Sequence, residues 1–344
     1  MSVAAAALCV LSGCGTGAAG EAGPAAPEGS LVQALAAVPA GTTAFQFNDQ
    51  QHALRRWGLG DITGAVVKDR DERLRDFTTR QLRSAVGSNL LAMAAVMDDW
   101  GWNGLDVSWE IVPDVEGPPV VISRLRDGVD FRTVADSFAA HDFVRSGSGD
   151  DIRFDRAAGK IPAVPVFLSG VTLVPSKHLV IAGPATFRLP AAGSSLADKP
   201  EMISLIAGVG QVDYASMATG DKACERAQEI LGPRATPEVI DRITSQRGDL
   251  RPITARLEVA TDDRAGTVIT RYQDDATAAA DLSARTKLMQ SGSSVVSQSP
   301  YSDYFGAAVN QSGNSLRYSL DFKDGSRVML SMVNQRDQPW AFCS

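Results

Sequence analysis

The sequence predicts an α+β fold of two similar halves, each an antiparallel sheet with helices packed on one face. Three observations predict it. Apolar and polar residues alternate over residues 105–111 and again over 253–259, which is the period of a half-buried strand. Each alternating run is followed by a second short apolar run, at 121–127 and 268–274, and then by a helical pattern. The same order returns at a near-constant spacing, and a chain of 344 residues is long enough for about two domains, so we favour a duplication.

Each half is expected to open with a strand that leads into a helix. The first of these strands is residues 44–47 and the second is residues 212–217. We expect the second strand to precede a helix that carries Cys224.

A second helix follows the central strands of each half. In the first half Asp130 is a candidate N-cap, and apolar residues recur at helical spacing over 131–138. In the second half the helix covers residues 275–289 and is rich in alanine. Both helices are expected to lead into similar loops, at 145–148 and 290–293.

Each half is expected to close with a β-hairpin. In the first half, residues 171–174 turn into residues 179–182. In the second half, residues 316–322 lead through an Asp-Gly turn at 323–326 into residues 327–333.

Composition indicates an ordinary globular body. Hydrophobic residues make up 44% of the chain and charged residues 21%. Proline, glycine and serine accumulate over residues 184–208, so we expect the halves to comprise residues 31–190 and 208–344. The net charge of −7 argues against a nucleic-acid partner.

The N-terminus carries a short apolar run, residues 3–11, that ends in Leu11-Ser12-Gly13-Cys14. These four residues resemble the lipobox of bacterial lipoproteins, and the chain resembles actinobacterial-type lipoproteins of unknown function. The resemblance implies that residues 1–13 are a signal peptide and that Cys14 receives a diacylglycerol. It also implies a protein anchored to membrane lipid on the extracytoplasmic side of the cell membrane. Residues 1–13 lack the basic residues that open a secretory signal, so we expect a truncated signal and an upstream start codon.

Residues 14–30 are expected to form a flexible tether. They contain no large apolar side chain and are rich in glycine, alanine and proline. Sixteen residues of such coil span roughly 20–24 Å, which holds a folded body just clear of the lipid headgroups. The alternative is a cytosolic protein with an alanine-rich start.

The cysteines fit an exported protein. Of the four cysteines, the resemblance accounts for Cys9 and Cys14. Cysteines in an oxidising compartment usually pair, so we expect Cys224 and Cys343 to form a structural disulfide.

No catalytic or metal-binding motif is recognisable, so we expect no cofactor, no metal site and no enzymatic activity. The nucleophile elbow is missing, and neither a phosphate-binding loop nor a dinucleotide-binding glycine pattern follows a predicted strand. None of the three histidines has the spacing of metal ligands. Two pairs of carboxylates could in principle serve a glycosidase, but such pairs arise by chance among 40 acidic residues. These residues are His52, His141 and His178, and the pairs Asp98–Asp99 and Asp106–Glu110.

Three of the five tryptophans lie within ten residues of one another, at Trp100, Trp102 and Trp109. Trp109 lies on the apolar side of its strand and belongs to the core. Trp100 and Trp102 are candidate ligand contacts, since exposed indole rings stack on sugars. The alternative is that they pack the corner between a buried helix at 90–97 and the following strand.

These observations favour a non-catalytic binding or interaction module of the cell envelope, with an envelope protein or a wall polymer as partner. One alternative is a carrier or sensor of an apolar ligand, which predicts a large void lined by leucine, valine and phenylalanine. Another alternative is a hydrolase of wall glycans, which predicts two carboxylates about 5–10 Å apart across a cleft.

Overall fold

The computed structural model describes residues 29–64, 70–90, 97–157, 170–226, 230–232, 236–238, 240–241 and 249–343. The expected signal peptide, Cys14 and nearly all of the expected tether lie outside the described residues, as does the middle of the helix expected at 90–97.

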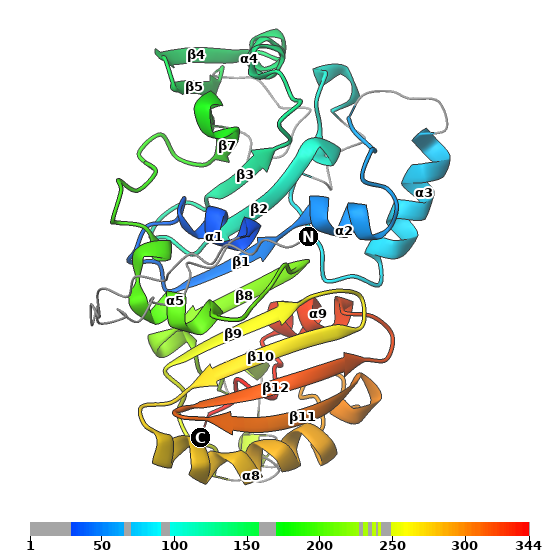
Figure 1. Cartoon of the computed structure of the whole chain (residues 1–344), viewed down its shortest axis with the longest axis vertical. Coiled ribbons are helices and arrows are strands. Elements are labelled where there is room, and N and C mark those ends of the chain that lie inside the picture. Colours follow the sequence, from blue (N-terminus) through cyan, green and yellow to red (C-terminus); the bar gives the residue numbers. More distant parts are fainter. Residues whose placement is uncertain are drawn as a thin grey trace, which may run out of the picture.

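Among the described residues, twelve strands form one antiparallel sheet, so the α+β class is confirmed (Figure 1). The strands are β1 (Ala44–Asn48), β2 (Val107–Pro113), β3 (Val121–Leu125), β4 (Phe143–Ser148), β5 (Asp151–Arg156), β6 (Gly170–Val174), β7 (Leu179–Ala182), β8 (Tyr214–Thr219), β9 (Ala255–Ala260), β10 (Ala265–Arg271), β11 (Phe305–Ser312) and β12 (Ser315–Phe322). Their order across the sheet is β11-β12-β10-β9-β8-β1-β2-β3-β7-β6-β5-β4. Strand β1 pairs with β8 at the centre, so the expected separate sheets are in fact one continuous sheet.

Helices lie on both faces of this sheet, and not on one face as expected. The helices are α1 (Ser30–Leu35), α2 (Gln50–Arg56), α3 (Arg70–Gln81), α4 (Phe131–Ala140), α5 (Pro200–Ile206), α8 (Asp275–Ser291) and α9 (Arg327–Gln335). Helices α1 and α5 share a core cluster with Phe45, Met217 and Leu257 of the central strands. Side chains alternate between the faces of a strand, so Tyr214 of β8 points the other way and joins the cluster of α8 and α9. Helix α4 packs on β3, β6 and β7 in a third cluster.

Most of the expected strands are confirmed, because their alternation is strong. Residues 105–111 and 253–259 contain most of β2 and β9. The run at 121–127 contains β3, and the run at 268–274 covers the second half of β10, which begins at Ala265. The first expected hairpin is the antiparallel pair β6–β7. Asp130 is the N-cap of α4, accepting a 3.0 Å hydrogen bond from the Arg132 amide. Asp274 caps α8 in the same way through the Thr277 amide, at 2.7 Å.

The prediction of a second hairpin, formed by residues 316–322 and 327–333, is wrong. Strand β12 pairs with β11, which precedes it, and residues 327–335 form helix α9. Met329, Leu330 and Met332 are all buried, which is the spacing of a helix face and not of a strand. Strand β11 was missed because its sequence, FGAAVNQS, contains only two large apolar residues.

Two further expectations are corrected. Cys224 lies on irregular backbone after a short 3₁₀ turn, Gly220–Lys222, and not on a helix. Residues 145–148 belong to strand β4, whereas α8 runs on to Ser291, so the two helices do not lead into similar loops.

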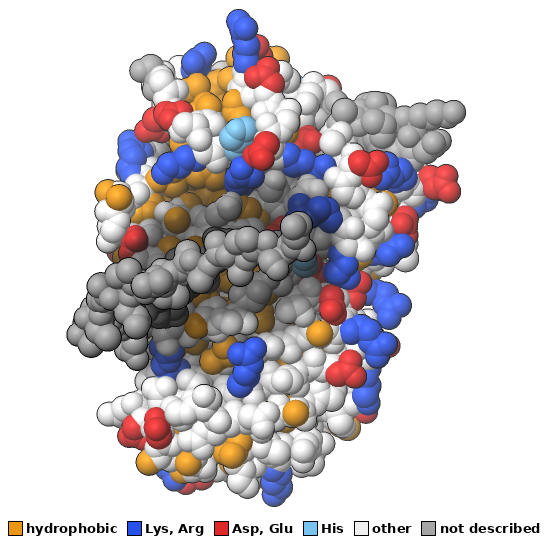
Figure 2. Space-filling model, in the orientation of Figure 1, with side chains coloured by type: hydrophobic (Ala, Val, Ile, Leu, Met, Phe, Trp, Pro, Cys, Tyr) orange, Lys and Arg blue, Asp and Glu red, His pale blue; other side chains and the backbone are white. Residues whose placement is uncertain are grey.

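Charged side chains of both signs are mixed over the edge of the molecule formed by α2 and α3 (Figure 2). Arg80 pairs with Asp76 one turn away on α3, at 3.0 Å, and Arg73 pairs with Asp61. These residues belong to a solvated helix face that carries two exposed ion pairs.

Candidate functional site: a pocket at the centre of the sheet

The two candidate tryptophans lie in the protein core. Only 3% of Trp100 and 1% of Trp102 is exposed. Both rings pack against Phe138 of α4, and the Trp102 indole N–H donates to the Ser137 hydroxyl at 3.0 Å. His141 stacks on Trp100 with ring centroids 4.2 Å apart. A buried ring offers no face to a ligand, so Trp100 and Trp102 are core residues and not the expected ligand contacts.

Side-chain hydrogen bonds hold His52 and His141, and no group of metal ligands occurs among the residues described. His52 contacts the buried carboxylate of Asp213 at 2.9 Å, and Arg56 pairs with the same carboxylate. His141 contacts Asp99 at 3.1 Å. His178 has left-handed backbone in the β6–β7 turn.

The carboxylates Asp106 and Glu110 stabilise local structure. Both are buried. Asp106 accepts the backbone amides of Gly64 and Asn103, at 3.0 and 2.9 Å, which closes the turn before β2. This carboxylate is fully engaged by the backbone and does not resemble half of a glycosidase pair.

Glu110 holds a segment of the pocket described below. Its Oε1 accepts the backbone and side-chain amides of Asn89, at 2.8 and 3.0 Å. Its Oε2 accepts the hydroxyls of Ser88 and Ser123, at 2.9 and 3.1 Å. Burial raises the pKa of Glu110, and the hydrogen bonds from these donors oppose that rise only in part.

The raised pKa of Glu110 predicts a pH dependence of stability. The contribution of Glu110 is fully present below the pKa of the unfolded chain and is lost as the pH rises through the higher pKa of the folded state. Glu110→Gln can keep the contacts, with the amide oxygen facing Asn89 and the amide nitrogen facing the two hydroxyls. We therefore expect the stability of Glu110→Gln, relative to the unsubstituted chain, to increase between pH 4 and pH 8.

Urea unfolding of both chains across this pH range measures the effect. Glu116→Gln, at an exposed site in the turn after β2, is the matched control and should leave the pH profile unchanged. A Glu110→Gln profile parallel to that of the unsubstituted chain would show that Glu110 remains charged in the folded protein.

A pocket of about 840 Å³ lies where the central strands end. We call it the central pocket. It is lined by Ala44, Phe45, Gln46, Asn89, Val112, Pro113, Asp114, Val115, Gly117, Pro119, Ser216, Met217, Ala218, Asp221, Lys222, Glu225, Arg256, Val333 and Arg336.

The sheet register brings these distant segments together. Strand β1 is antiparallel to both of its neighbours, so its start lies beside the ends of β2 and β8. Phe45 is opposite Pro113 on β2, and Ala44 is opposite Ala218 on β8. Helix α9 adds Val333, and its C-cap residue, Arg336, completes that wall.

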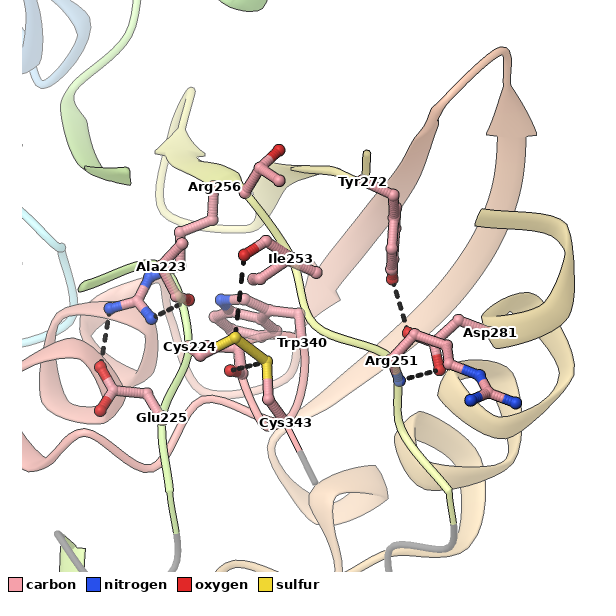
Figure 3. Close-up of a disulfide and its surroundings, with 12 residues drawn as sticks. Ala223, Cys224, Glu225, Arg251, Ile253, Arg256, Tyr272, Asp281, Trp340 and Cys343 are labelled. Carbon is pink, nitrogen blue, oxygen red and sulfur yellow. Dashed lines mark hydrogen bonds and ion pairs between the residues drawn. A yellow bond between two sulfur atoms is a disulfide. The ribbon is translucent and has the colours of Figure 1, made fainter. Parts of the chain in front are cut away.

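A buried ion-pair network forms one wall of the central pocket. Arg256 of β9 donates to the Ala223 carbonyl at 2.7 Å and to the Glu225 carboxylate at 2.8 Å, as Figure 3 shows. Its Nε lies 3.0 Å from the Glu258 carboxylate. Arg336 donates to the second oxygen of Glu225 at 2.6 Å. Glu225 therefore joins a strand arginine to the arginine that caps α9.

The mouth of the pocket is also charged. Lys222, in the turn after β8, pairs with Asp114 at the end of β2, and both side chains are about half exposed. Gln46 donates to Asn334 at 3.3 Å, which links the floor of the pocket to α9. The lining holds acidic and basic side chains in equal number, namely Asp114, Asp221 and Glu225 against Lys222, Arg256 and Arg336. Such a surface suits a polar ligand that offers both hydrogen-bond donors and acceptors.

The expected disulfide between Cys224 and Cys343 is confirmed, and it borders this wall. Cys224 directly precedes Glu225, and the two α-carbons of the disulfide lie 5.5 Å apart. The amide of Glu225 donates to the Ala341 carbonyl at 2.7 Å, and the amide of Cys343 donates to the Glu225 carbonyl at 3.1 Å. Sequence reasoning found this cysteine pair but not the pocket beside it.

Within the described part of the chain, no helix is both long enough and apolar enough to cross a bilayer. Comparison of the chain with protein-family models, with curated proteins and with solved structures finds no match.

Proposed function

We propose that this chain is a lipid-anchored lipoprotein that acts outside the cytoplasm as a non-catalytic binding module of the cell envelope. Its central pocket is the ligand site, and this pocket of about 840 Å³ with a charged, hydrogen-bonding lining is the observation that carries the binding role. The ligand is a small polar molecule or the end of a wall polymer or envelope protein.

The proposed location rests on the N-terminal residues and the cysteine chemistry. Leu11-Ser12-Gly13-Cys14 resembles a lipobox, and residues 15–30 have the composition of a flexible tether. A disulfide between Cys224 and Cys343 fits an oxidising compartment. Membrane lipid is then the partner of the anchor, through Cys14.

The lining of the pocket favours a binding module over both alternatives. A carrier of apolar molecules needs walls of leucine, valine and phenylalanine, whereas half of this lining is polar or charged. A glycan hydrolase needs a protonated carboxylic acid opposite a free carboxylate. Two of the three carboxylates of the pocket, Asp114 and Glu225, are engaged in ion pairs with basic side chains.

We further propose that the body arose by duplication, with halves at 31–190 and 208–344. Strands β1, β2 and β3 with helix α4 have the same order as β8, β9 and β10 with helix α8. Glu110 and Glu258 support the correspondence, since each is fully buried near the middle of the second strand of its half. Strands β4 and β5 are then an insertion in the first half.

Filling the pocket tests the binding role. Val333→Trp places a large ring in the wall formed by α9, at a partly exposed site where the fold can tolerate it. A ligand that binds only the folded state raises the melting temperature. We expect the small-molecule fraction of envelope extract to stabilise the unsubstituted chain but not Val333→Trp.

Gln335→Trp, exposed on the same helix and outside the pocket, is the matched control and should respond like the unsubstituted chain. Equal stabilisation of all three chains would mean that the ligand binds elsewhere.

Anchoring is tested separately at Cys14. We expect the full-length chain, produced in its own host, to fractionate with membranes and to carry a lipid-modified N-terminal cysteine. Cys14→Ala should remove the lipid and release the body from the membrane, because no described helix can replace the anchor. Unchanged membrane association of Cys14→Ala would contradict the lipoprotein proposal.

A further inference from the structure

We infer that the Cys224–Cys343 disulfide is a redox-sensitive clamp that positions the charged wall of the central pocket. The clamp follows from the contacts of Glu225 alone, and only its effect on ligand binding rests on the proposed function. Figure 3 shows the disulfide, Glu225 and Arg256 grouped at one place.

Besides the disulfide, side-chain contacts of Arg256 with Ala223 and Glu225 hold this segment, but among the described residues the backbone of Glu225 itself is held only by one short bridge. It forms an isolated parallel bridge with Phe342, made by two hydrogen bonds of 2.7 and 3.1 Å. Such a bridge is weak on its own, because each of its hydrogen bonds replaces one that the unfolded chain makes with water. The covalent bond at the adjacent residue, Cys224, supplies the missing restraint.

The partner side of the bridge is firmly fixed. Trp340, Ala341 and Phe342 are fully buried, and the Trp340 indole donates to Glu258 at 3.1 Å. Loss of the disulfide is therefore expected to free the segment of Glu225, while the C-terminal segment stays in the core.

Glu225 transmits this restraint to the pocket. Its carboxylate is 3% exposed and accepts hydrogen bonds from both Arg256 and Arg336. A shift of Glu225 leaves two guanidinium groups of the wall without their shared counter-charge. Oxidation thus sets the geometry and the charge of this wall, and reduction changes both.

The switch is a thiol–disulfide exchange with a dithiol reductant. The two thiols of the reductant lose two electrons and two protons and form a disulfide. The sulfurs of Cys224 and Cys343 gain those electrons and protons and become thiols. Both cysteines are partly exposed, so a reductant can reach them.

Hydrogen–deuterium exchange of the full chain, before and after treatment with dithiothreitol, tests the clamp. We expect amides at 222–226 and at Cys343 to exchange about tenfold faster after reduction, at a rate that low concentrations of urea leave unchanged, because these amides open locally. Amides of β10 and β12 should exchange faster only by as much as the loss of global stability requires, and their exchange should depend steeply on urea. The double variant Cys224→Ser/Cys343→Ser should behave like the reduced chain without any reductant. Glu225→Gln should keep the protection of both backbone amides, because it changes only the side chain.

Unchanged exchange at these amides would show that the bridge holds without the disulfide and would overturn the inference. Exchange at 222–226 that depends on urea as steeply as exchange over β10 and β12 would also overturn it, because the segment would then open only when the whole fold unfolds. Neither result depends on a ligand. Failure of the oxidised chain to bind any ligand would contradict the proposed function and leave the clamp intact.

Discussion

Replacing Arg285 by methionine is expected to lower the free energy of unfolding by about 3–5 kcal/mol. Arg285 and Asp281 lie one turn apart on α8, 2.7 Å from each other, and both are completely buried. Arg285 also donates to the carbonyls of Trp340 and Arg251, at 3.1 and 3.0 Å. Methionine matches the aliphatic stem, but it leaves the carboxylate of Asp281 buried without its counter-charge.

Remaining contacts to Asp281 do not replace the lost charge. The Tyr272 hydroxyl donates to it at 2.8 Å and the Arg251 amide at 3.1 Å, and both donors are neutral. Urea unfolding measures the loss. Arg80→Met on α3 is the matched control, because its ion pair with Asp76 is close to half exposed and contributes less than about 1 kcal/mol. Similar losses in the two variants would contradict the assignment of Arg285 as the centre of a buried network.

Removal of the disulfide is expected to lower the free energy of unfolding by about 2–5 kcal/mol. The bond joins residues 119 apart in sequence, and a loop of that length restricts the unfolded chain strongly. In Cys224→Ser/Cys343→Ser the unfolded state regains this freedom and exposes more surface, so the urea dependence should steepen as well.

The unsubstituted chain under reducing conditions should unfold at the same urea concentration as the double serine variant. A double variant as stable as the oxidised chain would mean that the native state is strained by the bond or that the unfolded chain is already compact. Either outcome would contradict the entropic account of its stabilising effect.

Much of the fold could be predicted because alternation is a local signal. Strands β2 and β9 bury alternate apolar side chains against α1 and α5. This burial requires apolar and polar residues to alternate along the strand, which can be read from a few consecutive residues. Strand β11 lies at an edge of the sheet and needs few large side chains, so its alternation is weak. Helix α9 was taken for a strand because a short apolar segment next to an Asp-Gly turn satisfies both patterns.

The candidate site could be predicted only in part. The pairing of Cys224 with Cys343 was predicted because only these two cysteines remain after Cys9 and Cys14 are assigned to the expected N-terminal signal. The pocket draws Gln46, Glu225 and Arg256 from segments that meet only through strand pairing. The spacing of residues in the sequence does not show which strands pair, so it could not predict the pocket. The prediction that Trp100 and Trp102 contact a ligand was wrong, because closeness of tryptophans in sequence does not show that their rings are exposed.

The most direct test of the central claim is native mass spectrometry of the full chain isolated from the cells that produce it. The proposed function predicts a bound small molecule on the unsubstituted chain and on Gln335→Trp, and its loss from Val333→Trp. The same adduct on all three chains, or no adduct on any of them, would contradict a ligand site in the central pocket.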